Sequence, residues 1–306
     1  MLNKSTVIKR LAFIKYLYKL AVDQSRRPEP LCSASILFFH DAIELFLQLA
    51  SEHVEVGKQQ PSFMEYWSLI SQKLPNQELT QKESMRRLNR ARVALKHHGN
   101  LPSKLDIEAF RAITTNFFEE NTPIVFDIDF SDVTLVELIQ CEGVKNILKE
   151  AEELLKENKI EESLDKVALA FAQLIDDYEG RKIGRYGKSL FFFGESMTFL
   201  SSSHMGINRV TGPEFERLAE FIDKVSKSIE SLQQAVKILS LGIDYSRYVK
   251  FRLLTPHISR NMKGDYIILR GRENSKVKST IEDVQFCIDF VIESAVTLQE
   301  FDFSVE

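Results

Sequence analysis

The chain has 306 residues, of which 44% are apolar and 27% are charged, and its formal net charge at pH 7 is -4. This length suits one large domain or two of ordinary size, and the composition is that of a folded globular protein. The small net charge excludes a chain that is basic throughout, so contact with nucleic acid requires local patches. Three separated cysteines without a Cys-x-x-Cys pair argue against a zinc site or a disulfide framework and fit a reducing compartment.

Residues 1–121 carry the apolar periodicity of successive helices. Apolar positions recur at helical spacing over residues 5–23, and the strongly apolar segment 33–52 predicts a central helix. A short helix is expected after Pro61. No signal-peptide core forms near the amino terminus and no apolar run approaches the ~20 residues that span a bilayer, so we expect a cytoplasmic protein that makes no membrane contact.

The next helix is basic and has its own start and stop signals. Thr80 and Glu83 have the spacing of a capping box, which predicts where this helix begins. Gly99 is a typical residue for ending it. A second capping box at Ser103 predicts another helix that runs to about Asn121.

Residues 122–131 alternate apolar and acidic side chains. This pattern is typical of an extended linker or a short strand, and we place the domain boundary there. A helical hairpin, a long helix with an apolar stripe and a final helix are expected within 132–306, with a strand near 264–271. The predicted fold is therefore all-α: a helical bundle over 1–121, then a second helical domain with at most a small β-hairpin.

The basic helix holds the strongest candidate for chemistry in the chain. Histidine exchanges protons near neutral pH, and arginine binds phosphate through a planar fork of donors. Together these residue types point to chemistry on a phosphodiester, since RNA cleavage without a metal ion needs proton transfer and cations around the phosphorane. The helix carries Arg86, Arg87, Arg90, Arg92, Lys96, His97 and His98.

Helical geometry separates the arginines from the histidines on this helix. At 100° per residue, Arg92 and Lys96 are neighbours, whereas His97 lies about 140° from Arg92. A site that uses both needs a second wall from another helix or a second subunit. Arg92 acting with His98, or Arg90 acting with His97, fits the spacing equally well. A basic helix that is only a solvated face, with a histidine that caps its end, also fits.

The sequence from Arg92 to His97 resembles the Arg-x(4–6)-His signature of HEPN domains, over about residues 1–121. In that family the motif lies at the end of a helix in an all-α bundle. The preceding long helix commonly brings a polar or acidic residue toward the groove that the motif lines. Here that helix offers His40, Glu44 and Gln48 at i, i+4 and i+8. This polar stripe is either the solvent side of the helix or the second wall of the site.

The resemblance implies a homodimeric endoribonuclease that cuts RNA without a metal ion or other cofactor. By position, Arg92, His97 and Glu44 would be the catalytic residues, with His98 as the substitute for His97. Lys96 and Arg90 would bind RNA. Family members often serve as toxins or antiphage effectors, so a protein partner in a defence or toxin–antitoxin complex is also implied.

Val93 departs from the family pattern, because active members usually carry a polar residue directly after the arginine. The alternative function is therefore a catalytically degenerate scaffold that dimerises or binds RNA or a nucleotide within a larger complex.

A second basic segment lies between residues 245 and 278, where aromatic residues alternate with cations. Cations follow phosphates and aromatic rings stack on bases, so this segment is a candidate RNA-docking surface. A solvated loop region with aromatic anchors is the alternative. The cations that we expect to bind RNA are Arg247, Lys250, Arg252, Arg270 and Arg272.

Overall fold

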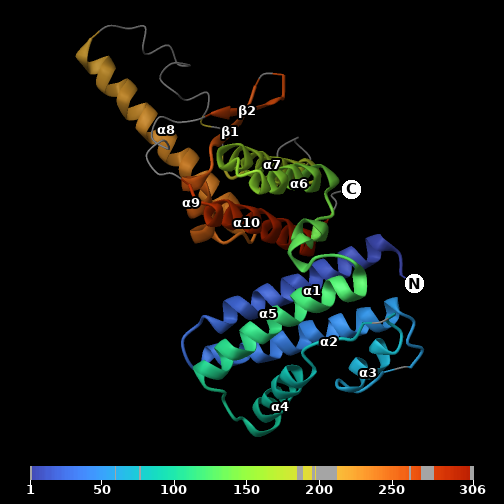
Figure 1. Cartoon of the computed structure of the whole chain (residues 1–306). Coiled ribbons are helices and arrows are strands. Elements are labelled where there is room, and N and C mark those ends of the chain that lie inside the picture. Colours follow the sequence, from blue (N-terminus) through green and yellow to red (C-terminus); the bar gives the residue numbers. More distant parts are fainter. Residues whose placement is uncertain are drawn as a thin grey trace. The chain divides into compact units, whose positions relative to one another are not determined.

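The computed structural model describes residues 2–58, 60–75, 77–184, 189–194, 197, 212–261, 263–269 and 279–303. These residues form ten α-helices and one two-stranded antiparallel sheet, which confirms the all-α class with a small β-hairpin (Figure 1). The chain divides into two compact units, Met1–Leu138 and Ile139–Glu306. Each unit buries an apolar core of its own.

Unit 1 is a helical bundle built around α2 (Ser35–His53). This helix contacts α1 (Lys4–Ser25), α3 (Glu65–Ser71), α4 (Lys82–His98) and α5 (Lys104–Phe126), which makes it the central helix expected from its apolar sequence. In Figure 1, α1, α2 and α5 run alongside one another, and α3 and α4 lie below α2. Fully buried side chains of α2 include Ile36, Phe39, Ile43, Phe46 and Leu47.

The stretch Leu31–His53, which is α2 and the short turn before it, is long and apolar enough to cross a membrane, with a mean hydropathy of 1.3. The sequence-based expectation that no apolar run approaches this length is therefore wrong. Of its most apolar window, 56% is buried inside unit 1. Packing against the neighbouring helices accounts for this apolar composition.

The extended linker predicted over residues 122–131 is not present. Helix α5 continues through Pro123 to Phe126, and a 3-10 turn follows at Phe130–Asp132. Val125, Phe126 and Phe130 are buried in the core of unit 1. Their burial offsets the ~3 kcal/mol that a proline costs inside a helix, because each large apolar side chain contributes about 1.5–3 kcal/mol.

The boundary between the two units lies after Leu138, so neither 1–121 nor 132–306 is the extent of a compact unit. The segment that follows α5 belongs to unit 1 because α1 holds it in place. The Nζ of Lys15 on α1 donates to the backbone carbonyls of Phe130, Ser131 and Val133 at 2.9, 3.0 and 2.6 Å.

The start of α4 is also held differently from the prediction. Gln81 precedes the helix in a left-handed conformation and no side chain caps it, so Thr80 and Glu83 form no capping box. The Thr80 hydroxyl instead accepts from Asn121 Nδ2 at 3.1 Å, and its backbone N donates to Asn121 Oδ1 at 2.9 Å. Trp67 Nε1 donates to the Thr80 carbonyl at 2.8 Å. Side chains from α3 and α5 thus position the chain where it enters α4.

Unit 2 contains the predicted helical hairpin, α6 and α7. Helix α10 packs against both and against α9, and the rings of Phe171, Phe251 and Phe290 meet in the core. The two strands pair antiparallel, with Ile258 opposite Ile268, and both contact α7. The elements are α6 (Glu142–Lys156), α7 (Ile160–Gly180), α8 (Pro213–Ser240), α9 (Tyr245–Leu254), β1 (His257–Arg260), β2 (Tyr266–Leu269) and α10 (Ile281–Glu300).

Candidate functional site at the α2–α4 face

Helix α4 presents the two halves of its motif on different sides. Arg92 is partly buried on the side that carries Asn89, whereas His97 and His98 are exposed in the last turn. Residues five apart in a helix differ by about 140° in direction and about 7.5 Å along the axis. The helix ends at Gly99 as predicted, since this residue has φ 66° and its N donates to the Leu95 carbonyl at 3.1 Å.

Helix α2 meets α4 through His40, which is only 3% exposed. The imidazole stacks on the ring of Phe63, with ring centroids 4.4 Å apart. Its Nε2 lies 3.1 Å from Asn89 Oδ1 on α4. Because an amide oxygen can only accept, Nε2 carries the proton and donates to Asn89.

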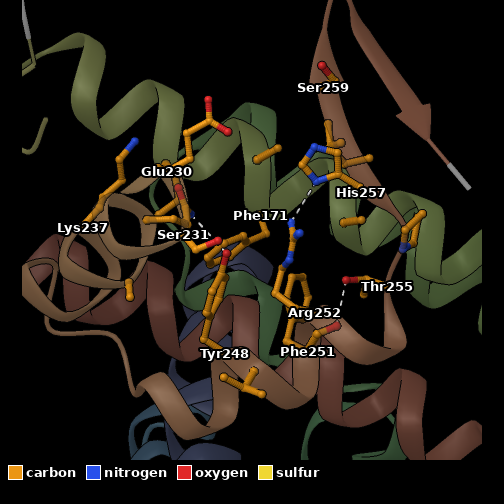
Figure 2. A pocket seen from close by; sticks show the side chains of 18 of the residues that line it. Phe171, Glu230, Ser231, Lys237, Tyr248, Phe251, Arg252, Thr255, His257 and Ser259 are labelled. Atoms are coloured by element: carbon orange, nitrogen blue, oxygen red, sulfur yellow. Dashed lines mark hydrogen bonds between the residues drawn. The ribbon is translucent and has the colours of Figure 1, made fainter. Parts of the chain in front are cut away.

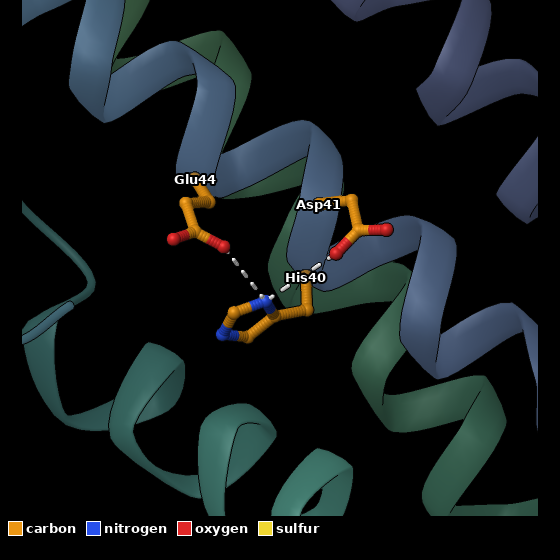
Figure 3. A group of neighbouring side chains, drawn as sticks. All are labelled: His40, Asp41 and Glu44. Atoms are coloured by element: carbon orange, nitrogen blue, oxygen red, sulfur yellow. Dashed lines mark ion pairs between the residues drawn. The ribbon is translucent and has the colours of Figure 1, made fainter. Parts of the chain in front are cut away.

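The other ring nitrogen of His40 faces two carboxylates (Figure 3). Nδ1 lies 3.6 Å from Glu44 Oε2 and 3.8 Å from Asp41 Oδ1, and it is buried without a hydrogen-bond partner. The three ligand atoms lie within 4.8 Å of one another. One imidazole nitrogen and two carboxylate oxygens form a donor set that a divalent cation such as Zn²⁺ or Mn²⁺ accepts.

The charge state of His40 depends on its burial and on α4. Burial lowers the pKa of His40 below its ordinary value of 6.5, and the positive charge of Arg92 lowers it further. Glu44, Asp41 and the hydrogen bond with Asn89 oppose this shift. Arg92 is therefore close enough to act on the buried imidazole, and the polar stripe of α2 faces α4 at His40.

The structure thus gathers some of the predicted site residues and separates others. Arg92 lies on the side of α4 near His40 and the partly buried Glu44. Arg90 and His97 lie on the outer side of α4, where Val93 is 37% exposed. Lys96 and His98 are exposed in the last turn. Within one chain, Arg92 and His97 therefore lie on different sides of α4.

The predicted RNA-docking cations of α9 also divide into two groups. Arg247 forms an ion pair with Glu293 on α10, and Lys250 Nζ lies 4.1 Å from the centre of the Phe286 ring. Arg252 points elsewhere and donates from Nη1 to His257 Nδ1 at 3.0 Å. Arg270 and Arg272 lie outside the described residues.

Sequence reasoning missed the roles of Asn89 and His257, and it left His40 with two interpretations. The i, i+3 spacing of Asn89 and Arg92 is a signal that both face one neighbour. No comparable signal links Arg252 to His257, because the chain turns from α9 into β1 between them.

Comparison with protein-family models, with curated proteins and with solved structures gives no match to this chain.

Proposed function

We propose that this protein is a HEPN-type endoribonuclease that cuts single-stranded RNA as a homodimer, without a metal ion in the chemical step. Such an activity suits a cytoplasmic toxin or antiphage effector that a protein partner holds in check. The observation that carries the proposal is the location of Arg92, which lies beside a polar wall of α2 that contains the buried His40 and the partly exposed Glu44. A merely solvated basic helix would not direct its arginine toward such a wall.

The reaction class follows from the residue types. The 2′ oxygen of the RNA attacks phosphorus and loses its proton to a base, the bond from phosphorus to the 5′ oxygen breaks, and that oxygen takes a proton from an acid. The products are a 2′,3′-cyclic phosphate and a 5′ hydroxyl. His97 of one copy acts as the acid beside Arg92 of the other copy, and a solvent water molecule takes the proton of the 2′ oxygen.

The remaining residues stabilise charge in this scheme. Arg92 and Lys96 bind the phosphorane oxygens, and Glu44 orients Arg92 from the facing helix. Arg90 contacts the RNA backbone on the outer side of α4. The wide angle between Arg92 and His97 is the reason that the scheme requires two copies, because each copy supplies the wall that the other lacks.

A binding scaffold is the second candidate function. Val93 supports it, since an apolar, exposed side chain stands on the same side of α4 as His97, where active HEPN proteins carry a polar residue. In that case α4 would hold RNA through its cations and would leave the phosphodiester intact.

The test compares wild type, Arg92→Ala and His97→Ala on single-stranded RNA in the presence of EDTA. The expected result is cleavage by wild type that produces 2′,3′-cyclic phosphate ends. Each variant should lose activity by about 10²-fold or more, the usual contribution of an acid–base group or a charge-stabilising donor.

Arg87→Ala and His98→Ala are the matched controls, because each removes the same side-chain type from an exposed position of the same helix. Both should retain activity, and loss in His98→Ala with retention in His97→Ala would transfer the acid–base role to His98. Cleavage that persists in both Arg92→Ala and His97→Ala, or that needs an added metal ion, would overturn the proposal. RNA that is bound and never cut favours the scaffold.

A further inference from the structure

Unit 2 contains a cavity of about 950 Å³ between α7, α8, α9 and the β-hairpin (Figure 2). Its size lies at the upper end of the range of about 300–1,000 Å³ that is usual for small-molecule sites. The α2–α4 face is in unit 1, so this cavity is a separate feature of the chain.

Hydrogen bonds between elements fix the walls of this cavity. Arg260 on β1 forms an ion pair with Asp176 on α7 at 2.8 Å, and the Tyr266 hydroxyl on β2 donates to the same carboxylate at 2.9 Å. Gln234 Nε2 on α8 donates to the Tyr248 hydroxyl on α9 at 3.1 Å. These three contacts join neighbouring elements that line the space, so the cavity is formed before any ligand enters.

Aromatic rings form the floor of the cavity. Phe171 lies 5.9 Å from Tyr248 and 5.0 Å from Phe251, measured between ring centroids. Tyr245 also lines the space, is 39% exposed and lies 6.1 Å from Tyr248. A flat ring that enters the cavity finds apolar faces to stack on, which is how proteins hold bases without reading their sequence.

Arg252 lines the same cavity, and none of the described carboxylates pairs with it. Arg252 extends from α9 toward His257 (Figure 2), and its guanidinium donates to Nδ1 of that histidine. A nitrogen that accepts from arginine is not protonated, so His257 is neutral and its Nε2 is a second donor. Within the described part of the chain, Arg252 has no ion pair, whereas Arg260 is paired with Asp176 and Lys237 with Glu179.

An unpaired guanidinium beside a neutral imidazole selects for an anion, and the planar fork of arginine matches a phosphate group. Lys227 at the α8 side of the cavity adds a second cation, and the exposed Glu230 can accept from sugar hydroxyls. The aromatic floor suits the base of a nucleotide, the arginine suits its phosphate, and the carboxylate that accepts from hydroxyls suits its sugar.

We propose that this cavity binds a nucleoside phosphate, with the phosphate on Arg252 and His257 and the base stacked against Tyr245 and Tyr248. The ligand is either a free nucleotide or one nucleotide of a single-stranded RNA, since both present the same chemistry.

Isothermal titration with AMP, CMP, adenosine and inorganic phosphate tests the proposal. The mononucleotides should bind at one site per chain and more tightly than adenosine or phosphate alone. Arg252→Gln should weaken nucleotide binding about ten- to hundredfold, the usual effect of losing a hydrogen bond to a charged group. Lys250→Gln is the matched control, because Lys250 is a cation of the same helix that lies against Phe286, outside the cavity. This variant should leave the binding of the mononucleotides unchanged.

A short RNA with blocked ends, titrated into the Arg92→Ala protein, distinguishes the two sources of the ligand. Binding of mononucleotides alone identifies a free nucleotide, whereas preferred binding of the RNA that Arg252→Gln weakens identifies a strand. Absence of saturable binding by any of these ligands, or equal weakening by Arg252→Gln and Lys250→Gln, would overturn the proposal. Because the readout is binding, its failure is independent of whether the chain cuts RNA.

Discussion

Two histidines in different units of this protein each have a pKa that burial and a nearby arginine lower. Burial is the main reason that the pKa values of His40 and His257 lie below 6.5, and a nearby arginine lowers each further, Arg92 for His40 and Arg252 for His257. A neutral imidazole leaves the charge of its arginine available for a phosphate. An arginine thus acts on a histidine both at the α2–α4 face and in the cavity of unit 2, although only Arg252 is hydrogen-bonded to its histidine.

The pH dependence of His257 follows from this arrangement. Because its pKa in the folded protein is below the ordinary value of 6.5, the unfolded chain takes up the proton first as pH falls. The stabilisation that the neutral His257 contributes is therefore present above pH 6.5 and is lost as pH falls through the lowered pKa. Titration by NMR should give a midpoint below 6.5 for this residue.

Arg252→Gln should raise the His257 midpoint toward 6.5, because the variant removes the arginine charge and leaves burial as the remaining cause of the shift. Lys250→Gln serves as the control and should not move the midpoint. A wild-type midpoint at or above 6.5, or one that Arg252→Gln leaves in place, would contradict the contact between these two side chains.

The helices of unit 1 show which helix ends are determined by the local sequence and which depend on contacts with distant residues. Gly99 and the capping box at Ser103 act as their sequence predicts, because these signals involve only the residues at one helix end. Thr80 does not cap the helix, because its hydroxyl and its backbone N are hydrogen-bonded to the side chain of Asn121, which is distant in sequence. Helix α5 continues past its predicted end near Asn121 and through Pro123, because buried core residues on both sides of the proline keep it helical.

The same distinction applies to the candidate sites. Arg92, Glu44 and Arg252 could be named from residue type and spacing along the chain. The contact of His40 with Asn89 could not, because it depends on how α2 packs on α4. Periodicity gives the face of a helix, and only tertiary packing decides which helix that face meets.

Asn121 holds the chain at Thr80, just before it enters α4. It is fully buried, and Asn121→Leu would remove the partner of the Thr80 backbone N. We expect a loss of about 1–3 kcal/mol in the free energy of unfolding, the cost of an unsatisfied buried polar group. Urea denaturation followed by circular dichroism measures this loss.

Glu120→Ala is the control for Asn121→Leu. It changes the neighbouring residue on α5, whose exposed carboxylate only accepts from the Gln81 side chain. This variant should stay within about 0.5 kcal/mol of wild type. Equal stability of Asn121→Leu and Glu120→Ala would show that the buried amide does not hold the start of α4.

At the scale of the whole molecule, the chain carries two candidate phosphate sites in two separate units, and each can be tested without the other. The unit 1 site differs from the unit 2 cavity in one respect. The cavity gathers its cation, donors and aromatic rings within one chain, whereas Arg92 and His97 lie on different sides of one helix. The proposed nuclease therefore requires a dimer in which two copies of the chain contribute to each site.

If Arg92 of one copy acts with His97 of the other, two inactive variants should restore activity when mixed. In a two-fold dimer of Arg92→Ala with His97→Ala, one site has both substitutions and the other has neither. After unfolding and refolding the two variants together, half of the dimers are mixed, so activity should recover to about a quarter of wild type. Each variant refolded alone controls for the procedure. No recovery, despite mixed dimers detected by differently tagged chains, would mean that Arg92 and His97 act within one chain.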